Sequence, residues 1–261
     1  KNSLRLGASK TYTLPQAKEI SPYRYVGVNF NSQGNPNLKP SDHYNLDLKW
    51  DFNPTPTELI SLTAFYKLIK NPISRIEVAS AGGYLSYENI ADKATVAGVE
   101  IEIRKNLFVR PVSNAAHGMN KLSLGLNGSY IYTNAKMPLA TVTTGSQLEG
   151  AAPWIVNFDL SHNFTKGERS FVNTLVLNYV SDKIYTIGTQ GYQDVMEQGV
   201  LILDFVSQAK LNKHLSLNLK ARNLLNPSYK LSRKANENGE KVILNDYKKG
   251  INISLGVSCT F

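Results

Sequence analysis

Apolar and polar residues alternate over repeated segments of similar length along this chain. From Ile251 to Phe261, the odd positions are apolar and the even positions are small or polar. Because successive side chains of a strand point to opposite faces, such a segment predicts a strand with one apolar and one polar face. The same alternation occurs, more weakly in the first case, in segments 4–8, 44–52, 62–68, 99–103, 122–132, 154–160, 171–179, 201–205 and 215–221.

The lengths of these strands and of their links predict an all-β, antiparallel, up-and-down transmembrane β-barrel fold. About ten strands of roughly 9–11 residues have the length that crosses a bilayer with tilt. Short and long links alternate, which is typical of membrane barrels with short periplasmic turns and long extracellular loops. We therefore expect consecutive strands to pair in sequence order. The shorter links are 53–56, 106–120, 165–168 and 212–213, and the longer ones are about 13–41, 71–93, 133–152, 181–199 and 223–249.

Aromatic residues gather at both ends of the predicted apolar face. Amphipathic rings favour the two membrane interfaces, so a spanning barrel should carry two aromatic girdles. An alternative is that the rings cap the core of a soluble sandwich, since aromatic residues are common in strands. The periplasmic group would be Trp50, Phe52, Phe164, Phe171 and Phe261, and the outer group would be Tyr44, Tyr66, Tyr130, Tyr132, Trp154 and Tyr179.

Bulk composition is compatible with this fold. The 261 residues are 42% hydrophobic, and the mean hydropathy of −0.26 is that of an average water-soluble chain. A membrane barrel can have such values because only half of each strand faces lipid. No apolar run reaches the length of a membrane-spanning helix, which excludes insertion through helices.

The net charge of +9 does not indicate a nucleic-acid partner. A basic chain can bind nucleic acid, but here the lysines and arginines are scattered and accompany no nucleic-acid motif. The pairs Arg104-Lys105 and Lys248-Lys249 lie at strand ends, where they fit anchoring at a membrane interface. The single cysteine, Cys259, forbids an internal disulfide.

The sequence gives no support for catalysis. The four histidines, His43, His117, His162 and His214, lie on different strands or loops without metal-ligand spacing. Neither a nucleophile elbow, nor a zinc-protease helix motif, nor a phosphate-binding glycine loop is present. We therefore predict that the chain is not an enzyme and has no catalytic, metal or cofactor-binding residues.

Several segments together resemble TonB-dependent outer-membrane receptors. Residues 34–40, Gly-Asn-Pro-Asn-Leu-Lys-Pro, lead into the strand at Tyr44 and are similar to a link of that family. Further similar segments are 4–23, 88–102 and 221–229, together with the end at Phe261. The resemblance covers nearly the whole chain, and the matching sequence motifs are most similar to those of receptors from the Bacteroidetes.

This resemblance implies a plugged barrel of the bacterial outer membrane, with about 22 strands. Residues 1–261 would be the C-terminal part of the barrel domain, without the plug and the N-terminal coupling segment. The expected partners are outer-membrane lipid and, through the missing N-terminal region, the TonB energy-coupling system. The ten strands would form an open, curved sheet whose last strand ends at Phe261, the barrel-terminal assembly residue.

The implied function is energy-coupled uptake of a scarce small ligand, namely an iron chelate, cobalamin or a glycan. Loops carry binding residues preferentially, although ordinary loop packing is the more common reason for aromatic and cationic loop residues. Two other functions stay open from the residues alone: a passive outer-membrane porin and a soluble β-sandwich binding module. The candidate ligand contacts are Tyr23, Arg24, Tyr25, Tyr84, Tyr87, Tyr185, Tyr192, Tyr229 and Arg233.

Overall fold

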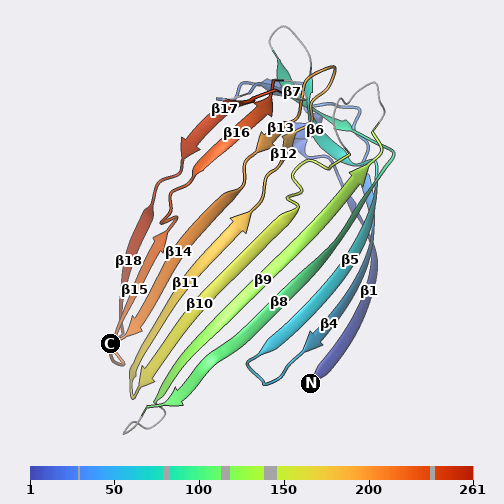
Figure 1. Cartoon of the computed structure of the whole chain (residues 1–261). Helices are drawn as coiled ribbons and strands as arrows, with labels where there is room; N and C mark the ends of the chain where they lie inside the picture. The colour runs from blue at the N-terminus through green and yellow to red at the C-terminus, as the bar shows by residue number, and fades with distance from the viewer. Residues whose placement is uncertain (29, 79–82, 113–117, 138–145, 236–238, 261) are drawn as a thin grey trace.

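A single curved sheet of long strands makes up most of the computed structural model, and two small sheets lie at one end of it (Figure 1). The structure describes residues 1–261 except 29, 79–82, 113–117, 138–145, 236–238 and 261. Phe261, the expected assembly residue, therefore lies outside the described residues. No helix among the described residues is long and apolar enough to cross a membrane.

The large sheet has ten strands, and each pairs antiparallel with its neighbour in chain order. The predicted up-and-down meander is therefore confirmed. The small sheets are formed by segments inside the long links. In order, the ten strands are β1 (Asn2–Thr13), β4 (Ser41–Phe52), β5 (Leu59–Lys70), β8 (Lys93–Pro111), β9 (Met119–Ala135), β10 (Trp154–Lys166), β11 (Arg169–Val180), β14 (Val200–Lys210), β15 (Leu215–Arg222) and β18 (Asn252–Cys259).

Strand lengths differ from the expected 9–11 residues. β8 has 19 residues and β9 has 17, whereas β15 and β18 have 8 each. The expected link from Asn106 to Asn120 was too long, because β8 continues to Pro111 across a register shift between Asn106 and Phe108. Such a bulge lets a strand continue where the alternation of the sequence is interrupted. The tight turn after β10 uses Gly167, whose φ of +58° suits glycine.

The register of the strands shows that the apolar residues share one face. Leu126 lies opposite Ile103 on β8 and Phe158 on β10, and Phe158 lies opposite Leu177 on β11. The same succession of pairs extends to both edges of the sheet and confirms the predicted sorting. The apolar set includes Leu46, Leu48, Leu124, Leu126, Val156, Leu177, Leu217, Ile253 and Leu255, and the opposite face carries Asp47, Lys49, Glu100, Glu102, Arg104, Asp159, Asn218, Lys220 and Arg222.

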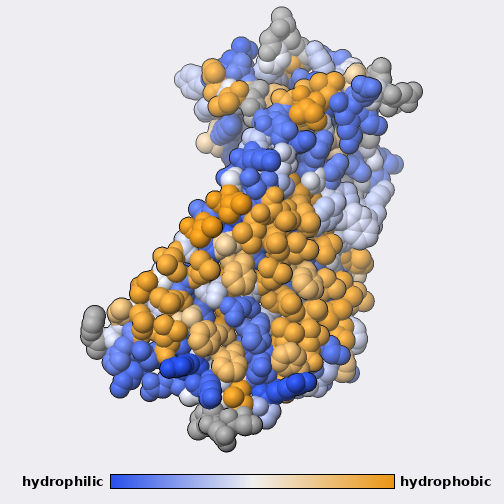
Figure 2. All heavy atoms as spheres, turned by 60° about the vertical axis from the view of Figure 1, so that its left-hand side comes forward, coloured by the Kyte–Doolittle hydropathy of each residue, from blue (hydrophilic) through white to orange (hydrophobic). Residues whose placement is uncertain are grey.

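The apolar face is the outer, convex one. Leu62 on this face is 48% exposed, whereas its neighbour Ser61 on the polar face is 2% exposed. Side chains crowd on the inside of a curved sheet and spread on the outside, so the polar set faces the lumen. Figure 2 shows the outer face as a broad hydrophobic band over the long strands, with hydrophilic atoms beyond both of its ends.

Lumen-facing polar residues hydrogen-bond across the strands. Asn157 on β10 accepts from Asn178 on β11 and donates to Asn127 on β9. The buried Asp51 on β4 forms an ion pair with Arg5 on β1. The Arg5 Nη2 lies 3.0 Å from the Asp51 carboxylate. These bonds tie neighbouring strands together and keep the inner wall polar.

Aromatic residues on the outer face lie in pairs near both ends of the strands. At the end that carries the short turns, the rings of Trp50 and Phe52 are stacked with centroids 6.3 Å apart, and Phe164 contacts Phe171 across β10 and β11. At the other end the rings of Tyr130 and Trp154 are 4.6 Å apart. The arrangement matches the expected girdles.

The sheet is open among the described residues. β1 pairs only with β4, and β18 pairs only with β15, so each is an edge of the sheet. The expectation of an open, curved sheet is therefore confirmed for this chain.

Candidate ligand-binding loops

The long links fold into two four-stranded sheets at one end of the large sheet (Figure 1). Their strands are short, and the sequence predicted these segments only as links. The four-residue helix α1 (Ala17–Ile20) precedes the first of them. One sheet contains β2 (Arg24–Tyr25), β3 (Ser32–Gln33), β7 (Tyr84–Asn89) and β6 (Ile73–Val78), and the other contains β12 (Lys183–Thr186), β13 (Val195–Glu197), β16 (Ser228–Lys234) and β17 (Lys241–Lys248).

The two small sheets meet at a parallel bridge between Ile76 and Ile187. The Glu77 amide donates to the Ile187 carbonyl, and the Ile187 amide donates to the Arg75 carbonyl, both at 3.0 Å. Both isoleucines are buried in an apolar cluster that also receives side chains from the ends of the large sheet. The loops are therefore packed as one structured assembly. The other members of the cluster are Ile90, Ala91, Ala94, Ala135, Leu148 and Ile184.

Arg75 connects three separate loops at this junction. Its amide and its guanidinium each donate to the Glu149 carboxylate at 2.8 Å. The guanidinium also donates to the Tyr185 carbonyl through Nε at 3.0 Å and Nη2 at 2.6 Å, and it lies 3.9 Å from the centre of the Tyr185 ring. These contacts occupy most of the donors of Arg75, which makes it a structural anchor of the loops.

Glu77 and Arg233 form a second link between the two small sheets. The Glu77 carboxylate accepts from the Arg233 guanidinium, and the Glu77 carbonyl accepts from the Thr189 hydroxyl. The Arg233 guanidinium also lies 5.3 Å from the centre of the Tyr192 ring. This charge-assisted hydrogen bond between a guanidinium on one sheet and a carboxylate on the other holds the two sheets together.

Burial changes the proton affinity of groups in this assembly. It raises the pKa of the Glu149 carboxyl above its usual value, while the hydrogen bonds from Arg75 oppose that shift. It lowers the pKa of the Arg233 guanidinium and raises the pKa of the Tyr87 phenol. Each shift follows from the cost of holding a charge away from water.

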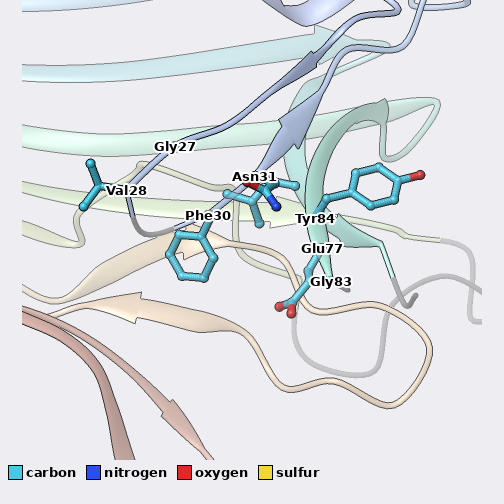
Figure 3. Close-up of a pocket in the computed structure, with 8 residues that line it drawn as sticks. Gly27, Val28, Phe30, Asn31, Glu77, Gly83 and Tyr84 are labelled. Carbon is cyan, nitrogen blue, oxygen red and sulfur yellow. The ribbon is translucent and has the colours of Figure 1, made fainter. Parts of the chain in front are cut away.

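A pocket of about 410 Å³ lies beside the first small sheet (Figure 3). Figure 3 shows the Phe30 ring and the Glu77 carboxylate on the same side of the pocket, whereas the Tyr84 ring points away from it. The Phe30 ring also contacts Tyr185, with centroids 6.1 Å apart. The pocket thus combines an apolar ring with a carboxylate, the kind of mixed lining that small-molecule sites use.

The structure distributes the predicted contact residues over three groups and one separate position. Arg24 lies 5.1 Å from the Tyr84 ring, Tyr185 packs on Arg75, and Tyr192 neighbours Arg233. Tyr229 is apart from these: it is 9% exposed, stacks on Tyr247, and has the Lys249 ammonium 3.8 Å from its ring centre.

Accessibility sorts the candidates further. Tyr23, Arg24 and Tyr25 are exposed together on the β2 segment, and Tyr23 is 76% exposed. Tyr87 is partly buried, and its carbonyl accepts from Asn35. The β2 residues are free of the anchoring contacts that engage Arg75 and Arg233, so they can meet a ligand without breaking the assembly. Their role in binding stays a prediction.

Phe30, Arg75, Glu77 and Glu149 were not predicted from the sequence. A signal was available for two of them, because residues 75–78 alternate polar and apolar as Arg-Ile-Glu-Val. That alternation predicts a short strand with Arg75 and Glu77 on one face. Nothing local distinguishes Phe30 or Glu149 from other loop residues. Within the described residues, no group of three or more His, Cys, Asp or Glu side chains could hold a metal ion.

Comparison with known families gives a match over most of the chain. Residues 2–224 match the model of the family described as TonB dependent receptor-like, beta-barrel. A curated relative, the iron-regulated outer membrane virulence protein of Vibrio cholerae, is 25% identical over an alignment of 208 residues that covers 76% of this chain and 29% of the relative. The chain thus spans less than a third of the length of this relative.

Solved structures with the same fold include transporters and receptors. The copper transporter OprC aligns over 100% of this chain and 38% of its own, with a TM-score of 0.65 and 13% identity. A variant of the ferric enterobactin receptor of Pseudomonas aeruginosa, in complex with enterobactin, has a TM-score of 0.60 and 16% identity over the same shares. The ferric yersiniabactin uptake receptor of Yersinia pestis has a TM-score of 0.57 and 15% identity, and 34% of it is covered. At such identities the likeness concerns the fold alone.

Proposed function

Because the chain belongs to the family of TonB-dependent receptor-like β-barrels, we propose that it forms part of the wall and loops of a receptor for energy-coupled uptake. Barrels of this family lie in the bacterial outer membrane. The match over residues 2–224, together with the ten-stranded meander, carries the proposal. A family of transporters gives no reason to expect catalysis by this chain.

Residues 1–261 are, in this proposal, the C-terminal part of the barrel domain of a longer receptor. About 22 strands enclose a plug in transporters of this kind, and ten are described here. The edges β1 and β18 would then pair with strands of the remaining wall, because lipid offers no partner for unpaired backbone groups. The plug and the segment that meets TonB would belong to the rest of the receptor.

The proposed ligand is an iron chelate, ahead of cobalamin or a glycan. Support comes from the Vibrio relative, whose name describes it as iron-regulated. The exposed β2 segment adds chemistry of the right kind: Arg24 supplies positive charge, and Tyr23 and Tyr25 supply flat aromatic surface. Guanidinium groups and aromatic rings suit an anionic, aromatic chelate.

Uptake by the full-length receptor tests this function. A receptor-deficient strain that produces the receptor should accumulate radiolabelled iron from a ferric catecholate, and the accumulation should stop when TonB is removed. Accumulation that persists without TonB would indicate a passive pore instead. Accumulation of labelled cobalamin or of an oligosaccharide, with no iron uptake, would keep the receptor assignment and replace the ligand.

Binding by variants tests the β2 residues separately. The combination Tyr23→Ala with Arg24→Gln should weaken ferric catecholate binding to the purified receptor by about tenfold or more, since binding sites concentrate energy in a few aromatic and arginine residues. Lys213→Gln, in a turn at the opposite end of the strands, is the control and should bind as the unaltered receptor does. Equal affinities for all three proteins would place the binding site outside this segment.

A further inference from the structure

A row of polar residues interrupts the apolar outer face of the large sheet. His162 on β10 lies directly opposite Asn173 on β11, and Asn173 lies opposite Ser207 on β14. Asn120 on β9 is paired with Phe164, two residues further along β10 on the same face. We call Asn120, His162, Asn173 and Ser207 the polar row.

The polar row lies near the periplasmic boundary of the apolar band. On β10 the outward positions run Trp154, Val156, Phe158, Leu160 and then His162. The eight steps from Trp154 to His162 rise by about 26 Å along the strand, or roughly 20 Å across the membrane at a tilt of about 40°. An apolar band about 25 Å tall would end close to this level. Glycerol and ester groups of lipids occupy that depth.

The hydrogen bonds within the polar row leave two NH₂ groups without an acceptor among the described residues. A carboxamide oxygen only accepts, so the His162 ring donates from Nε2 to Asn120 Oδ1 at 2.8 Å. The Ser207 hydroxyl donates to Asn173 Oδ1 at 2.7 Å. Among the described residues, the NH₂ groups of Asn120 and Asn173 have no hydrogen-bond partner. Polar groups next to hydrocarbon are costly unless they are paired, so these donors call for acceptors outside the protein.

Basic residues surround the row on the side of the short turns. Lys166 and Arg169 face each other across β10 and β11, beyond the Phe164 and Phe171 pair on the same face. Arg110 on β8 lies opposite Asn120, and its guanidinium is 5.5 Å from the centre of the Phe108 ring. We call Arg110, Lys166 and Arg169 the basic rim. All three are exposed.

Acidic residues are scarce on this face. Across the ten described strands, Asp42 is the one acidic residue at an outward position, and it lies at the far end of β4 beside Lys10. Glu168, in the two-residue turn after β10, is the acid nearest in sequence to the basic rim. Three cations therefore face one acid at the periplasmic end, and the exposed Lys105 on β8, opposite Leu124, adds a further outward cation nearby. The lower edge of the hydrophobic band in Figure 2 has the hydrophilic atoms that such a rim requires.

We propose that the polar row and the basic rim form a binding site for an anionic glycerophospholipid of the inner leaflet of the outer membrane. The basic rim pairs with the phosphate and any further negative charge of the headgroup. The NH₂ groups of Asn120 and Asn173 donate to the ester carbonyl oxygens of the glycerol backbone. The apolar band from Leu160 upward receives the acyl chains. One lipid molecule thus finds the basic rim, the polar row and the apolar band in the same order as its own phosphate, ester groups and acyl chains.

Native mass spectrometry of the full-length receptor tests the site with phosphatidylglycerol, phosphatidylethanolamine and phosphatidylcholine added one at a time. Phosphatidylglycerol should bind at lower concentration than the two zwitterionic lipids. The variant Lys166→Gln with Arg169→Gln should lose this preference, with about a fivefold weaker affinity for phosphatidylglycerol for each cation removed. The control Lys213→Gln removes one positive charge from another turn at the same end and should keep the preference.

A second variant tests the ester contacts independently. Asn120→Leu with Asn173→Leu should weaken all three phospholipids by similar factors, about fivefold for each lost hydrogen bond, because ester groups are common to them. A change of mobility on heating in a denaturing gel verifies that each variant is a folded barrel. Equal binding of the three lipids to the unaltered receptor would overturn the proposal. The proposal would also fail if Lys166→Gln with Arg169→Gln lost no more affinity for phosphatidylglycerol than Lys213→Gln does. It would fail too if the variants changed only the oligomeric state, because this face would then be a contact between receptor copies.

Discussion

Glu149 accepts two hydrogen bonds from Arg75, one from the backbone amide and one from the guanidinium, although the two residues are 74 positions apart in the chain. This pair joins the link between β5 and β8 to the link between β9 and β10. With the Ile76 and Ile187 bridge beside it, it makes the long loops a single packed body at the end of the barrel wall. The rigidity of the candidate ligand surface depends on this contact.

Replacing Arg75 should loosen the loops without unfolding the sheet. In Arg75→Gln the Glu149 carboxylate keeps the amide bond but loses the charged one, which should lower the free energy of local opening by about 1.5–3 kcal/mol. Amide hydrogen exchange should accelerate at Glu77 and Ile187, whose amides donate across the bridge, and remain unchanged in β9 and β10. Lys183→Gln is a matched control, because its ion pair with Glu197 is longer, at 3.4 Å, and partly exposed. Unchanged exchange at the bridge would show that Arg75 does not hold the loops together.

The loops should open more readily as the pH rises. Because burial raises the pKa of Glu149 in the folded loops, the folded state binds this proton more tightly than the opened state does. The resulting stabilisation is fully present below the ordinary glutamate pKa of about 4.3 and is lost as the pH rises through the raised value. The charged groups that act on Glu149 are Arg75, which favours its ionised form, and Glu19, which disfavours it.

Hydrogen exchange between about pH 4 and pH 8, corrected for intrinsic rates, measures this dependence. Glu149→Gln cannot titrate and should remove the change in opening free energy over that range. A variant with the same pH dependence as the unaltered protein would assign the effect to another group.

A charge on the lipid face should destabilise the barrel, whereas one on the lumen face should not. Leu126 lies between Ile103 and Phe158 in the apolar band, so Leu126→Arg should lower the free energy of unfolding in lipid by about 2–4 kcal/mol if it lies near the midplane. Gln208 is exposed on the lumen face, and Gln208→Arg is the matched control. Urea titrations of the full-length receptor in lipid vesicles give both values. Similar losses for the two variants would contradict the assignment of faces.

Gly98 is expected to tolerate no side chain. It lies opposite Phe65 on β5, and a Cβ atom at this position would overlap the Phe65 ring and the Tyr130 carbonyl oxygen. Gly98→Ala should therefore cost about 1–3 kcal/mol in unfolding free energy through overpacking. At Gly7 the nearest atom to an added Cβ is the Asp47 Cβ at 4.0 Å, an ordinary contact. Gly7→Ala should consequently be nearly neutral in the same denaturant titration, and a Gly98→Ala value equal to it would show that the Phe65 ring moves aside.

The family resemblance and the fold could be inferred from the residues, while most of the candidate site could not. The segment Gly34 to Pro40 and its companions led to the family that the comparison over residues 2–224 supports. Among the proposed ligand contacts, the sequence named Arg24 and Tyr23 but gave no reason to prefer them to the buried Tyr229. Their difference in accessibility arises from how the small sheets pack. The Bacteroidetes origin stays a prediction.

The sequence alone determined the ten strands, their order and the faces within each alternating segment, because these depend on a period of two and on neighbours in the chain. Only the tertiary structure decided the rest. The Ile76 and Ile187 bridge, the Arg75 and Glu149 pair and the polar row of His162 and Asn173 all join different segments. Such contacts follow from the register between strands and from the packing of distant loops, and a local pattern of residues specifies neither.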